Sequence, residues 1–333
     1  MALPLDKQRP IPSPALAPAA SEFEREGELT IGLINNMPDS ALKATERQFM
    51  RLVQSAAGKI RVRFHCFSLP SVPRSRQARE HIDKDYRDVA ELHRLPIDGL
   101  IVTGAEPLTP ALPEERYWRE FTDLVDWART NTRSTIWSCL AAHAAVLHLD
   151  GVGRQRLPQK CSGVYDCAKV ADDWLIGDLP ESIKVSHSRL NEVRERDLAS
   201  RGYSILTRSA QAGVDIFARD LESRFIFFQG HPEYDALSLQ REYMRDIARF
   251  LSGERNDYPT IPASYFDAET EAVLARFEAH ARVERKAELA AELPGLTLRP
   301  GVPAGGAAAT IFRSWLDFLG AEARALSSEP LRK

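Results

Sequence analysis

The chain has 333 residues, of which 44% are hydrophobic and 27% are charged, and its formal net charge is −3. This is the composition of an ordinary globular protein, long enough for one large domain or two modest ones. The near-neutral charge gives no electrostatic reason to expect nucleic-acid binding, and no run of about eighteen apolar residues predicts a membrane-spanning helix.

The N-terminal segment and the cysteines bear on where the protein resides. Residues 1–27 begin with a stretch rich in Pro and Ala that has no continuous apolar core, so we expect a disordered leader rather than a signal peptide. Four cysteines in a chain of this size are typical of the reducing cytoplasm, where we expect the protein to work. Cys161 and Cys167 are close in sequence, but no matching second pair exists, so we expect no metal site.

From Glu28 onward, strand-like and helix-like segments alternate. In chain order, we expect buried strands at 29–34, 60–67, 99–102 and 134–138, helices at 45–53, 115–131 and 140–147, and a polar surface loop leading into a helix over 68–90. This alternation predicts an α/β fold, a doubly wound and mostly parallel sheet flanked by helices. Ligands of such sheets bind at the carboxyl ends of the strands.

The second half of the chain has more turn-forming residues. We expect short strands at 160–165, near 186–189, at 214–218 and at 225–228, then a helix over 237–251. A charged, Ala-rich helix is predicted from Ala263 to about Leu293, a linker over 300–309 and a last amphipathic helix over 310–325. The predicted organisation is a leader (1–27), an α/β domain (28–255) and a C-terminal helical extension (256–333).

Cys139 lies at a predicted strand-to-helix corner. The apolar run Ser134–Ser138 precedes it and the Ala-rich run Leu140–Leu147 follows it. A side chain at such a corner is exposed at the carboxyl edge of the sheet, as in a nucleophile elbow, and the partial positive charge of the helix N-terminus favours a thiolate. Ala141 stands where such elbows often have Gly, and an inert buried cysteine is the alternative interpretation.

His231 and Glu233 follow the predicted strand 225–228 and flank Pro232, which restrains the backbone between them. This arrangement suits a base with a carboxylate that orients it, whereas two solvated polar residues at a strand end are the alternative. His143 is a rival base about one helical turn after Cys139, but we expect it to point along the helix. The predicted strand ends bring Cys139 and His231 to one crevice.

The chain resembles the homoserine O-succinyltransferase family, whose fold is that of the class I glutamine amidotransferases. The resemblance extends from near residue 29 to near residue 251, and its most specific parts are the Ser-Gly-Val-Tyr run at 162–165 and the Gly-His-Pro-Glu-Tyr-Asp-Ala run at 230–236. It implies transfer of an acyl group from succinyl-CoA to the hydroxyl of L-homoserine, a step of methionine biosynthesis. Cys139 would carry the acyl group, His231 would be the base and Glu233 would orient it.

The resemblance also implies the remaining site residues. The substrate contacts of similar proteins map onto Lys160, Ser188 and Arg245, and the two cations can bind the α-carboxylate of an amino acid. A solvated helix face is the alternative for Arg245. Backbone N–H groups of Leu140 and Ala105 are expected to form the oxyanion hole. Acyl-CoA would be a co-substrate, and no other cofactor is expected.

In the family, a position in the loop after Gly104 influences the choice of donor: glycine goes with succinyl-CoA and glutamate with acetyl-CoA. Ungapped counting back from Cys139 puts Leu108 at this position, and a slip of one residue puts Thr109 there. Neither residue is the glutamate that marks acetyl use, so we expect succinyl-CoA. Acetyl-CoA as the donor and serine as the acceptor stay open.

Two other classes of function remain as alternatives. A catalytically silent binding or regulatory protein could use the same fold, but the complete set of Cys139, His231 and Glu233 argues against it. A glutaminase of the amidotransferase type usually has a Gly-rich elbow, which residues 137–141 lack. The expected partners are small-molecule substrates, with neither nucleic acid nor membrane, and a homodimer stays open.

Overall fold

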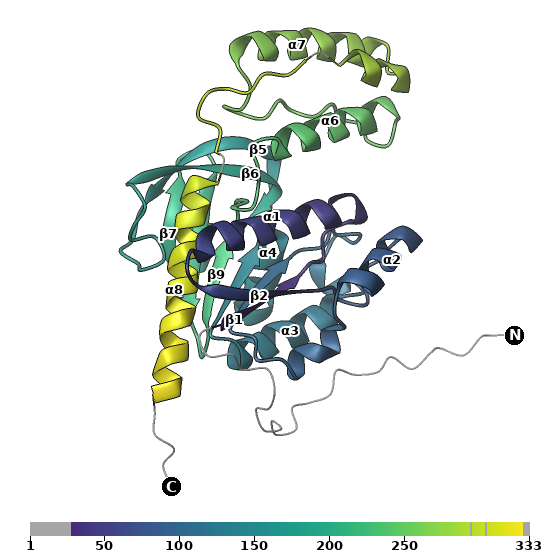
Figure 1. The fold of residues 1–333 in the computed structure, drawn as a ribbon. Coiled ribbons are helices and arrows are strands. Elements are labelled where there is room, and N and C mark those ends of the chain that lie inside the picture. Colours follow the sequence, from purple (N-terminus) through teal and green to yellow (C-terminus); the bar gives the residue numbers. More distant parts are fainter. Residues whose placement is uncertain (1–27, 294, 304, 329–333) are drawn as a thin grey trace, which may run out of the picture.

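The computed structural model in Figure 1 describes residues 28–293, 295–303 and 305–328, so the predicted leader lies outside the described residues. Within these ranges the strands form one sheet with the order β2-β1-β3-β4-β9-β8-β7-β5-β6. The strands are β1 (Glu28–Ile34), β2 (Arg61–Phe67), β3 (Gly99–Thr103), β4 (Ser134–Ser138), β5 (Gln155–Lys169), β6 (Ser182–Glu192), β7 (Ser204–Ser209), β8 (Gly213–Asp220) and β9 (Arg224–Phe228).

The helices alternate with the strands in the first half of the chain and gather at its C-terminal end. The α-helices are α1 (Asp39–Ala57), α2 (Arg76–Asp85), α3 (Trp118–Asn131), α4 (Leu140–Asp150), α5 (Glu195–Ala199), α6 (Ser238–Leu251), α7 (Ala268–Val283) and α8 (Gly306–Ser328). Short 3₁₀ turns are η1 (Val89–His93), η2 (Leu112–Glu114) and η3 (Ala287–Glu292). No described helix is both long enough and apolar enough to cross a membrane.

Five strands, β2, β1, β3, β4 and β9, are parallel and form the covered half of the sheet. Successive residues of a strand point to opposite faces, so Ile136 of β4 lies in the core with Phe49 of α1 and Trp315 of α8. Its neighbour Trp137 lies in the other core, with Phe121 of α3. Helices therefore cover both faces of this half (Figure 1), which confirms the predicted α/β class and the doubly wound parallel sheet.

The remaining strands, β8, β7, β5 and β6, are antiparallel and extend the sheet from β9. The prediction of short strands was wrong here, because β5 has 15 residues and β6 has 11. Both strands are largely half-buried or exposed along their length, so they lack the continuous apolar run that made the parallel strands visible in the sequence. Helices α6 and α7 lie over the end of this half (Figure 1), and β7 was not predicted at all.

The C-terminal helices also differ from their predicted bounds. Ala263 does not begin a helix, because it bridges to Gly163 of β5 and exchanges backbone hydrogen bonds with Ser162 and Val164. Gly163 has φ of +147°, and a Cβ there would come within 2.4 Å of the Ala263 carbonyl oxygen, so this approach requires glycine. Helix α7 begins after Asp267, whose side chain accepts a hydrogen bond from the backbone N–H of Thr270 at 2.8 Å.

Helix α8 begins at Gly306, inside the predicted linker, and packs against α1 over the parallel half. The predicted extension after residue 255 thus contributes Phe312, Trp315 and Leu319 to a core shared with the sheet, and the domain boundary itself stays a prediction. Helix α2 lies within the segment predicted as a loop that leads into a helix, and Ser75 caps it by accepting from the N–H of Ala78.

Candidate active site

Cys139 lies between β4 and α4 in a backbone conformation that L-residues rarely adopt, with φ of +52° and ψ of −110°. Its backbone N–H donates to the carbonyl oxygen of Phe228 at 2.7 Å, which ties the end of β4 to the end of β9. Strain of this kind persists where neighbouring structure enforces it, and it is typical of a nucleophile elbow. The corner predicted from the sequence is therefore present, and the Cys139 side chain is half-buried at the carboxyl edge of the sheet.

Gly104 follows β3 and packs directly on the first turn of α4. A Cβ at Gly104 would come within 2.4 Å of the Leu140 Cβ and 2.8 Å of the Ala141 backbone nitrogen. Nucleophile elbows often have Gly at the position of Ala141, which leaves room for close packing. Here Gly104 of the neighbouring loop leaves that room instead, and Ala141 is fully buried beside it. This contact brings the backbone of the loop at Ala105 next to the helix N-terminus at Leu140, the two groups expected to form the oxyanion hole.

His231 and Glu233 lie side by side after β9, and both side chains are buried. Nδ1 of His231 is 2.9 Å from Oε1 of Glu233, while its Nε2 has no hydrogen-bond partner among the described residues. The imidazole ring stacks on the ring of Tyr234, with centroids 4.1 Å apart and planes 17° apart. One nitrogen is thus held by a carboxylate and the other is free to exchange a proton, as a general acid–base requires.

The charges around His231 favour its protonated form. Burial acts to lower the pKa of His231, but the negative charges of Glu233 and Cys139 outweigh burial and raise that pKa well above its usual value. The site therefore favours an imidazolium beside the sulfur of Cys139. Such a pairing supplies a thiolate nucleophile and an acid for the leaving group at the same time.

His143 is not a second base. Its side chain is buried, and Nε2 lies 2.9 Å from Oε1 of Gln229, whose amide also bonds the backbone of Val193 and Val214. Burial lowers the pKa of His143 to about 3, more than the bond to Gln229 raises it. This histidine is neutral at physiological pH and joins α4 to the sheet, in agreement with the expectation that it does not serve the corner.

The three residues mapped from the family as substrate contacts gather around two carboxylates of α6. Nζ of Lys160 lies 3.1 Å from Asp246 and 3.5 Å from Glu242. Ser188 donates to Glu242, and Arg245 lies 3.1 Å from Asp246. Lys160 comes from β5, Ser188 from β6 and Arg245 from α6, so the fold brings together residues that are far apart in the sequence.

Tyr234 connects this polar cluster to His231. Its ring stacks on His231 and its hydroxyl donates to Oε1 of Glu242 at 2.5 Å. Burial acts to raise the pKa of Glu242, but Lys160, His231 and the hydrogen bond from Ser188 outweigh it and lower that pKa. Glu242 and Tyr234 are thus site residues that the sequence reasoning missed. The spacing between Glu242 and Asp246, one helical turn apart on α6, was the available signal.

Leu108, the expected donor-selecting residue, lies in the loop after β3 with its side chain 72% exposed. Its backbone N–H donates to Oε1 of Glu115 at 2.7 Å, and the N–H of Thr109 donates to the same atom at 2.6 Å. The Thr109 hydroxyl is also 2.7 Å from this oxygen. One buried carboxylate therefore fixes the shape of the loop and leaves the Leu108 side chain toward solvent.

The sequence is similar to proteins of known name over nearly its whole length. A family model described as homoserine O-succinyltransferase matches residues 15–284. A homoserine O-succinyltransferase of Bradyrhizobium japonicum is 62% identical over 96% of this chain and 99% of that protein. A protein with the same name from Rhodopseudomonas palustris is 56% identical over 97% of this chain and 100% of that protein. Another from Methylorubrum extorquens is 47% identical over 86% of this chain and 86% of that protein.

The solved structures that match this chain are more distant in sequence. A glutamine amidotransferase from Thermotoga maritima is 12% identical, with a TM-score of 0.47 over 89% of this chain and 99% of that chain. A glutamine amidotransferase from Methylobacillus flagellatus is 13% identical, with a TM-score of 0.48 over 88% of this chain and 95% of that chain.

Proposed function

The chain belongs to the homoserine O-succinyltransferase family, and we propose that it transfers the succinyl group of succinyl-CoA to the hydroxyl of L-homoserine through an acyl-enzyme on Cys139. The observation that carries the mechanism is the meeting of a strained cysteine corner and a carboxylate-held histidine at the joined ends of β4 and β9. The product, O-succinylhomoserine, is an intermediate of methionine biosynthesis. An acyltransferase of this kind uses acyl-CoA as a co-substrate, and no step calls for another cofactor.

In the first half-reaction, the Cys139 thiolate attacks the thioester carbonyl carbon of succinyl-CoA. The bond from that carbon to the CoA sulfur then breaks, and the CoA thiolate takes a proton from Nε2 of His231. The raised pKa of His231 keeps this proton available in the resting enzyme, because the imidazolium is the stable form beside Glu233 and a thiolate. The half-reaction leaves a succinyl thioester on Cys139, free CoA and a neutral imidazole.

In the second half-reaction, the neutral His231 takes the proton from the homoserine hydroxyl as its oxygen attacks the thioester on Cys139. The bond from the carbonyl carbon to Sγ breaks, and the thiolate–imidazolium pair is restored. Glu233 holds Nδ1 throughout, so it fixes the ring and stabilises the imidazolium that forms. Both tetrahedral intermediates carry an oxyanion, for which the backbone N–H groups of Leu140 and Ala105 are the proposed donors.

The polar cluster beside Tyr234 is the proposed acceptor site. Lys160 and Arg245 share Asp246 in the substrate-free protein, so an incoming α-carboxylate replaces one partner of existing cations rather than burying new charge. The cluster holds carboxylates as well as cations, which suits a zwitterionic amino acid. The stacking of Tyr234 on His231 places this cluster next to the base that must reach the acceptor hydroxyl.

A matrix of substrates tests the proposal. Purified protein is offered succinyl-CoA or acetyl-CoA, each with L-homoserine or L-serine, and the release of CoA thiol is followed with a chromogenic thiol reagent. We expect rapid release only with succinyl-CoA and L-homoserine. Preference for acetyl-CoA would show that our assignment of the donor is wrong, and preference for L-serine would show that our assignment of the acceptor is wrong. Either result would leave the acyl-enzyme mechanism intact.

The acyl-enzyme is tested separately by intact-protein mass spectrometry with succinyl-CoA and no acceptor. We expect the mass of one succinyl group to be added, to map to Cys139 after digestion, and to disappear when L-homoserine is added. Absence of the adduct, together with no thiol release from any substrate pair by a folded protein, would overturn the proposed function.

A further inference from the structure

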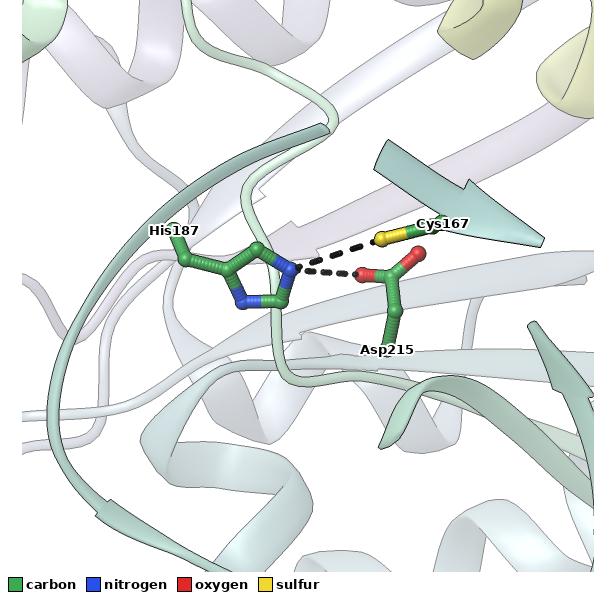
Figure 2. A group of neighbouring side chains, drawn as sticks. All are labelled: Cys167, His187 and Asp215. Atoms are coloured by element: carbon green, nitrogen blue, oxygen red, sulfur yellow. Dashed lines mark hydrogen bonds and ion pairs between the residues drawn. The ribbon is translucent and has the colours of Figure 1, made fainter. Parts of the chain in front are cut away.

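Cys167, His187 and Asp215 form a second cluster of reactive side chains that the proposed mechanism does not use. They come from β5, β6 and β8 of the antiparallel half, and all three side chains are fully buried. Figure 2 shows them pointing toward one another. One ligand atom from each, Sγ, an imidazole nitrogen and a carboxylate oxygen, lies within 4.8 Å of the other two.

The arrangement is not a relay like that of the catalytic residues. A relay uses both imidazole nitrogens, as in His231, where Nδ1 faces Glu233 and Nε2 is free. In the second cluster, Cys167 Sγ at 4.0 Å and Asp215 Oδ1 at 3.4 Å both face the same atom, Nε2 of His187 (Figure 2). Each of the three residues therefore offers one ligand atom to the same small volume, as a metal site requires, provided that Nε2 of His187 carries no proton.

The Asp215 carboxylate is otherwise poorly compensated. Its side chain is 0% exposed, and Oδ2 accepts a hydrogen bond from the Thr207 hydroxyl at 2.9 Å. Oδ1 faces Nε2 of His187 at 3.4 Å, which is long for a hydrogen bond. A buried carboxylate without a full set of partners is costly, and a bound cation is one of the ways in which proteins compensate it.

A cavity leads to this carboxylate. Its lining includes Asp215, Ser186 of β6 and His231, and its volume is about 40 Å³. One water needs roughly 10–15 Å³, so the cavity can hold a water next to Asp215. Of the three cluster residues, Asp215 lines this cavity, so a water held there could serve as a further ligand beside the three protein atoms.

We propose that Cys167 Sγ, His187 Nε2 and Asp215 Oδ1 bind one zinc ion, with a water from the cavity as the fourth ligand. Tetrahedral zinc with bonds of about 2.3 Å to sulfur and about 2.0–2.2 Å to nitrogen and oxygen separates its ligands by roughly 3.3–3.7 Å. The two separations at His187 are 3.4 Å and 4.0 Å, and all three ligand atoms lie within 4.8 Å of one another, so binding must draw them inward by up to about 1 Å. A set of one sulfur, one nitrogen and one oxygen suits zinc and disfavours magnesium and calcium, which take oxygen ligands.

Zinc binding at this place replaces the thiol proton of Cys167, which passes to solvent, with the metal. The ion ties β5, β6 and β8 together directly under the turn that carries the catalytic base. Gly230, the residue before His231, packs so closely there that a Cβ would come within 2.5 Å of Asp215 Oδ1. The proposal departs from the expectation of no metal site, which considered cysteine spacing along the chain and not side chains from three strands.

Cobalt(II) substitution tests the site without relying on activity. The full-length protein is freed of metal with a chelator and titrated with Co²⁺, while the near-ultraviolet absorption of cobalt–thiolate bonds is recorded. We expect a band that saturates at one Co²⁺ per chain and disappears when Zn²⁺ is added. Zn²⁺ should also raise the midpoint of thermal unfolding of the metal-free protein, because a ligand that binds only the folded state stabilises it.

Matched variants assign the band to its ligands. Cys167→Ser should abolish it, whereas Cys161→Ser, on the same strand but outside the cluster, should keep it. Cys139→Ser should also keep it, which excludes binding at the catalytic thiol. Asp215→Asn retains an oxygen for Thr207 and should fold, as circular dichroism can verify, yet lose the zinc-dependent rise in the unfolding midpoint.

Three results would overturn the proposal. The first is the absence of a thiolate–cobalt band in the wild-type protein at excess Co²⁺, a result that depends on no variant. The second is a band that survives Cys167→Ser or is lost with Cys139→Ser. The third is an equal rise of the unfolding midpoint with Zn²⁺ in the wild type and in folded Asp215→Asn.

Discussion

The two halves of the sheet are built differently and carry different parts of the site. The parallel half is covered by helices on both faces, and the corner at Cys139 lies at the carboxyl end of one of its inner strands. The antiparallel half has longer and more exposed strands, and it supplies Lys160 and Ser188 to the polar cluster on α6. The proposed nucleophile thus lies on the helix-covered half and the proposed acceptor contacts on the other.

The join between the halves shows how they cooperate. Strand β9 pairs parallel with β4 and antiparallel with β8, so it belongs to both. His231 follows β9 and its backbone N–H donates to the carbonyl oxygen of Ser186 on β6 at 2.9 Å. His231, the proposed base, is therefore held by the parallel half through β9 and by the antiparallel half through Ser186, which suits a group proposed to act in both half-reactions.

The largest loss of activity should come from a substitution in the parallel half. Cys139→Ala removes the nucleophile, so we expect both half-reactions to be lost, by at least about 10⁴-fold in turnover. Turnover is measured by thiol release, and retention of the fold by the thermal unfolding midpoint. Cys161→Ala, which removes a cysteine of the antiparallel half, is the matched control and should remain active. Substantial turnover by a folded Cys139→Ala protein would rule out the covalent mechanism.

A smaller loss of activity should come from a substitution in the antiparallel half, and it should affect only the binding of the acceptor. Lys160→Met keeps the aliphatic stem and removes the cation, which costs about 1.5–3 kcal/mol for a hydrogen bond to a charged group. We expect KM for L-homoserine to rise about 10- to 150-fold. The rate of the first CoA release, measured in a single turnover without acceptor, should change little.

Lys169→Met is the control for this variant, because Lys169 lies on the same strand and its ammonium donates to the Gly177 carbonyl oxygen, away from the polar cluster. Lys169→Met should leave the KM for L-homoserine and the single-turnover rate of CoA release near those of the wild type. Loss of single-turnover acylation in Lys160→Met would contradict the division of labour between the halves. Such a loss would indicate that Lys160 acts on the donor or on the base.

The same division explains what could be predicted from the sequence. Parallel strands buried on both faces read as short apolar runs, so β3, β4 and β9 were visible together with the corner at Cys139 and the base at His231. The strands β5 and β6 carry mixed polar and apolar residues, and their length depends on pairing with each other rather than on local sequence. Their bounds, and the whole of β7, were therefore beyond a pattern-based prediction.

The polar clusters depend still more on tertiary structure. Glu242 and Asp246 look like ordinary solvated charges of an amphipathic helix until β5 and β6 bring Lys160 and Ser188 to them. Asp215 likewise looks like one polar residue in a strand. Family resemblance could supply Lys160, but neither the resemblance nor the spacing identified the carboxylates that hold it, because those contacts join segments far apart in the chain.

The smallest loss of activity should come from replacing Glu233, the carboxylate that holds His231 after β9. Glu233→Gln keeps an oxygen that accepts from Nδ1 of His231 and removes only the charge. The difference between a charged and a neutral hydrogen bond is about 1–1.5 kcal/mol, so acylation at neutral pH should slow about tenfold. Asp235→Asn, which removes a nearby charge paired with Arg241, is the control and should have little effect.

The pH dependence of this variant gives its sharpest test. Glu233 raises the pKa of His231, so the imidazolium that protonates the leaving CoA persists to higher pH in the wild type. Removing the charge lowers that pKa, and the alkaline limb of kcat/KM for the acyl donor should move to lower pH. A raised histidine pKa also stabilises the fold, fully below about pH 6.5, the usual value of the unfolded chain, and less as pH rises through the folded value. The difference in unfolding free energy between the wild type and Glu233→Gln should therefore be largest below about pH 6.5 and shrink as the pH rises. If the alkaline limb of kcat/KM does not move in Glu233→Gln, another group supplies the proton.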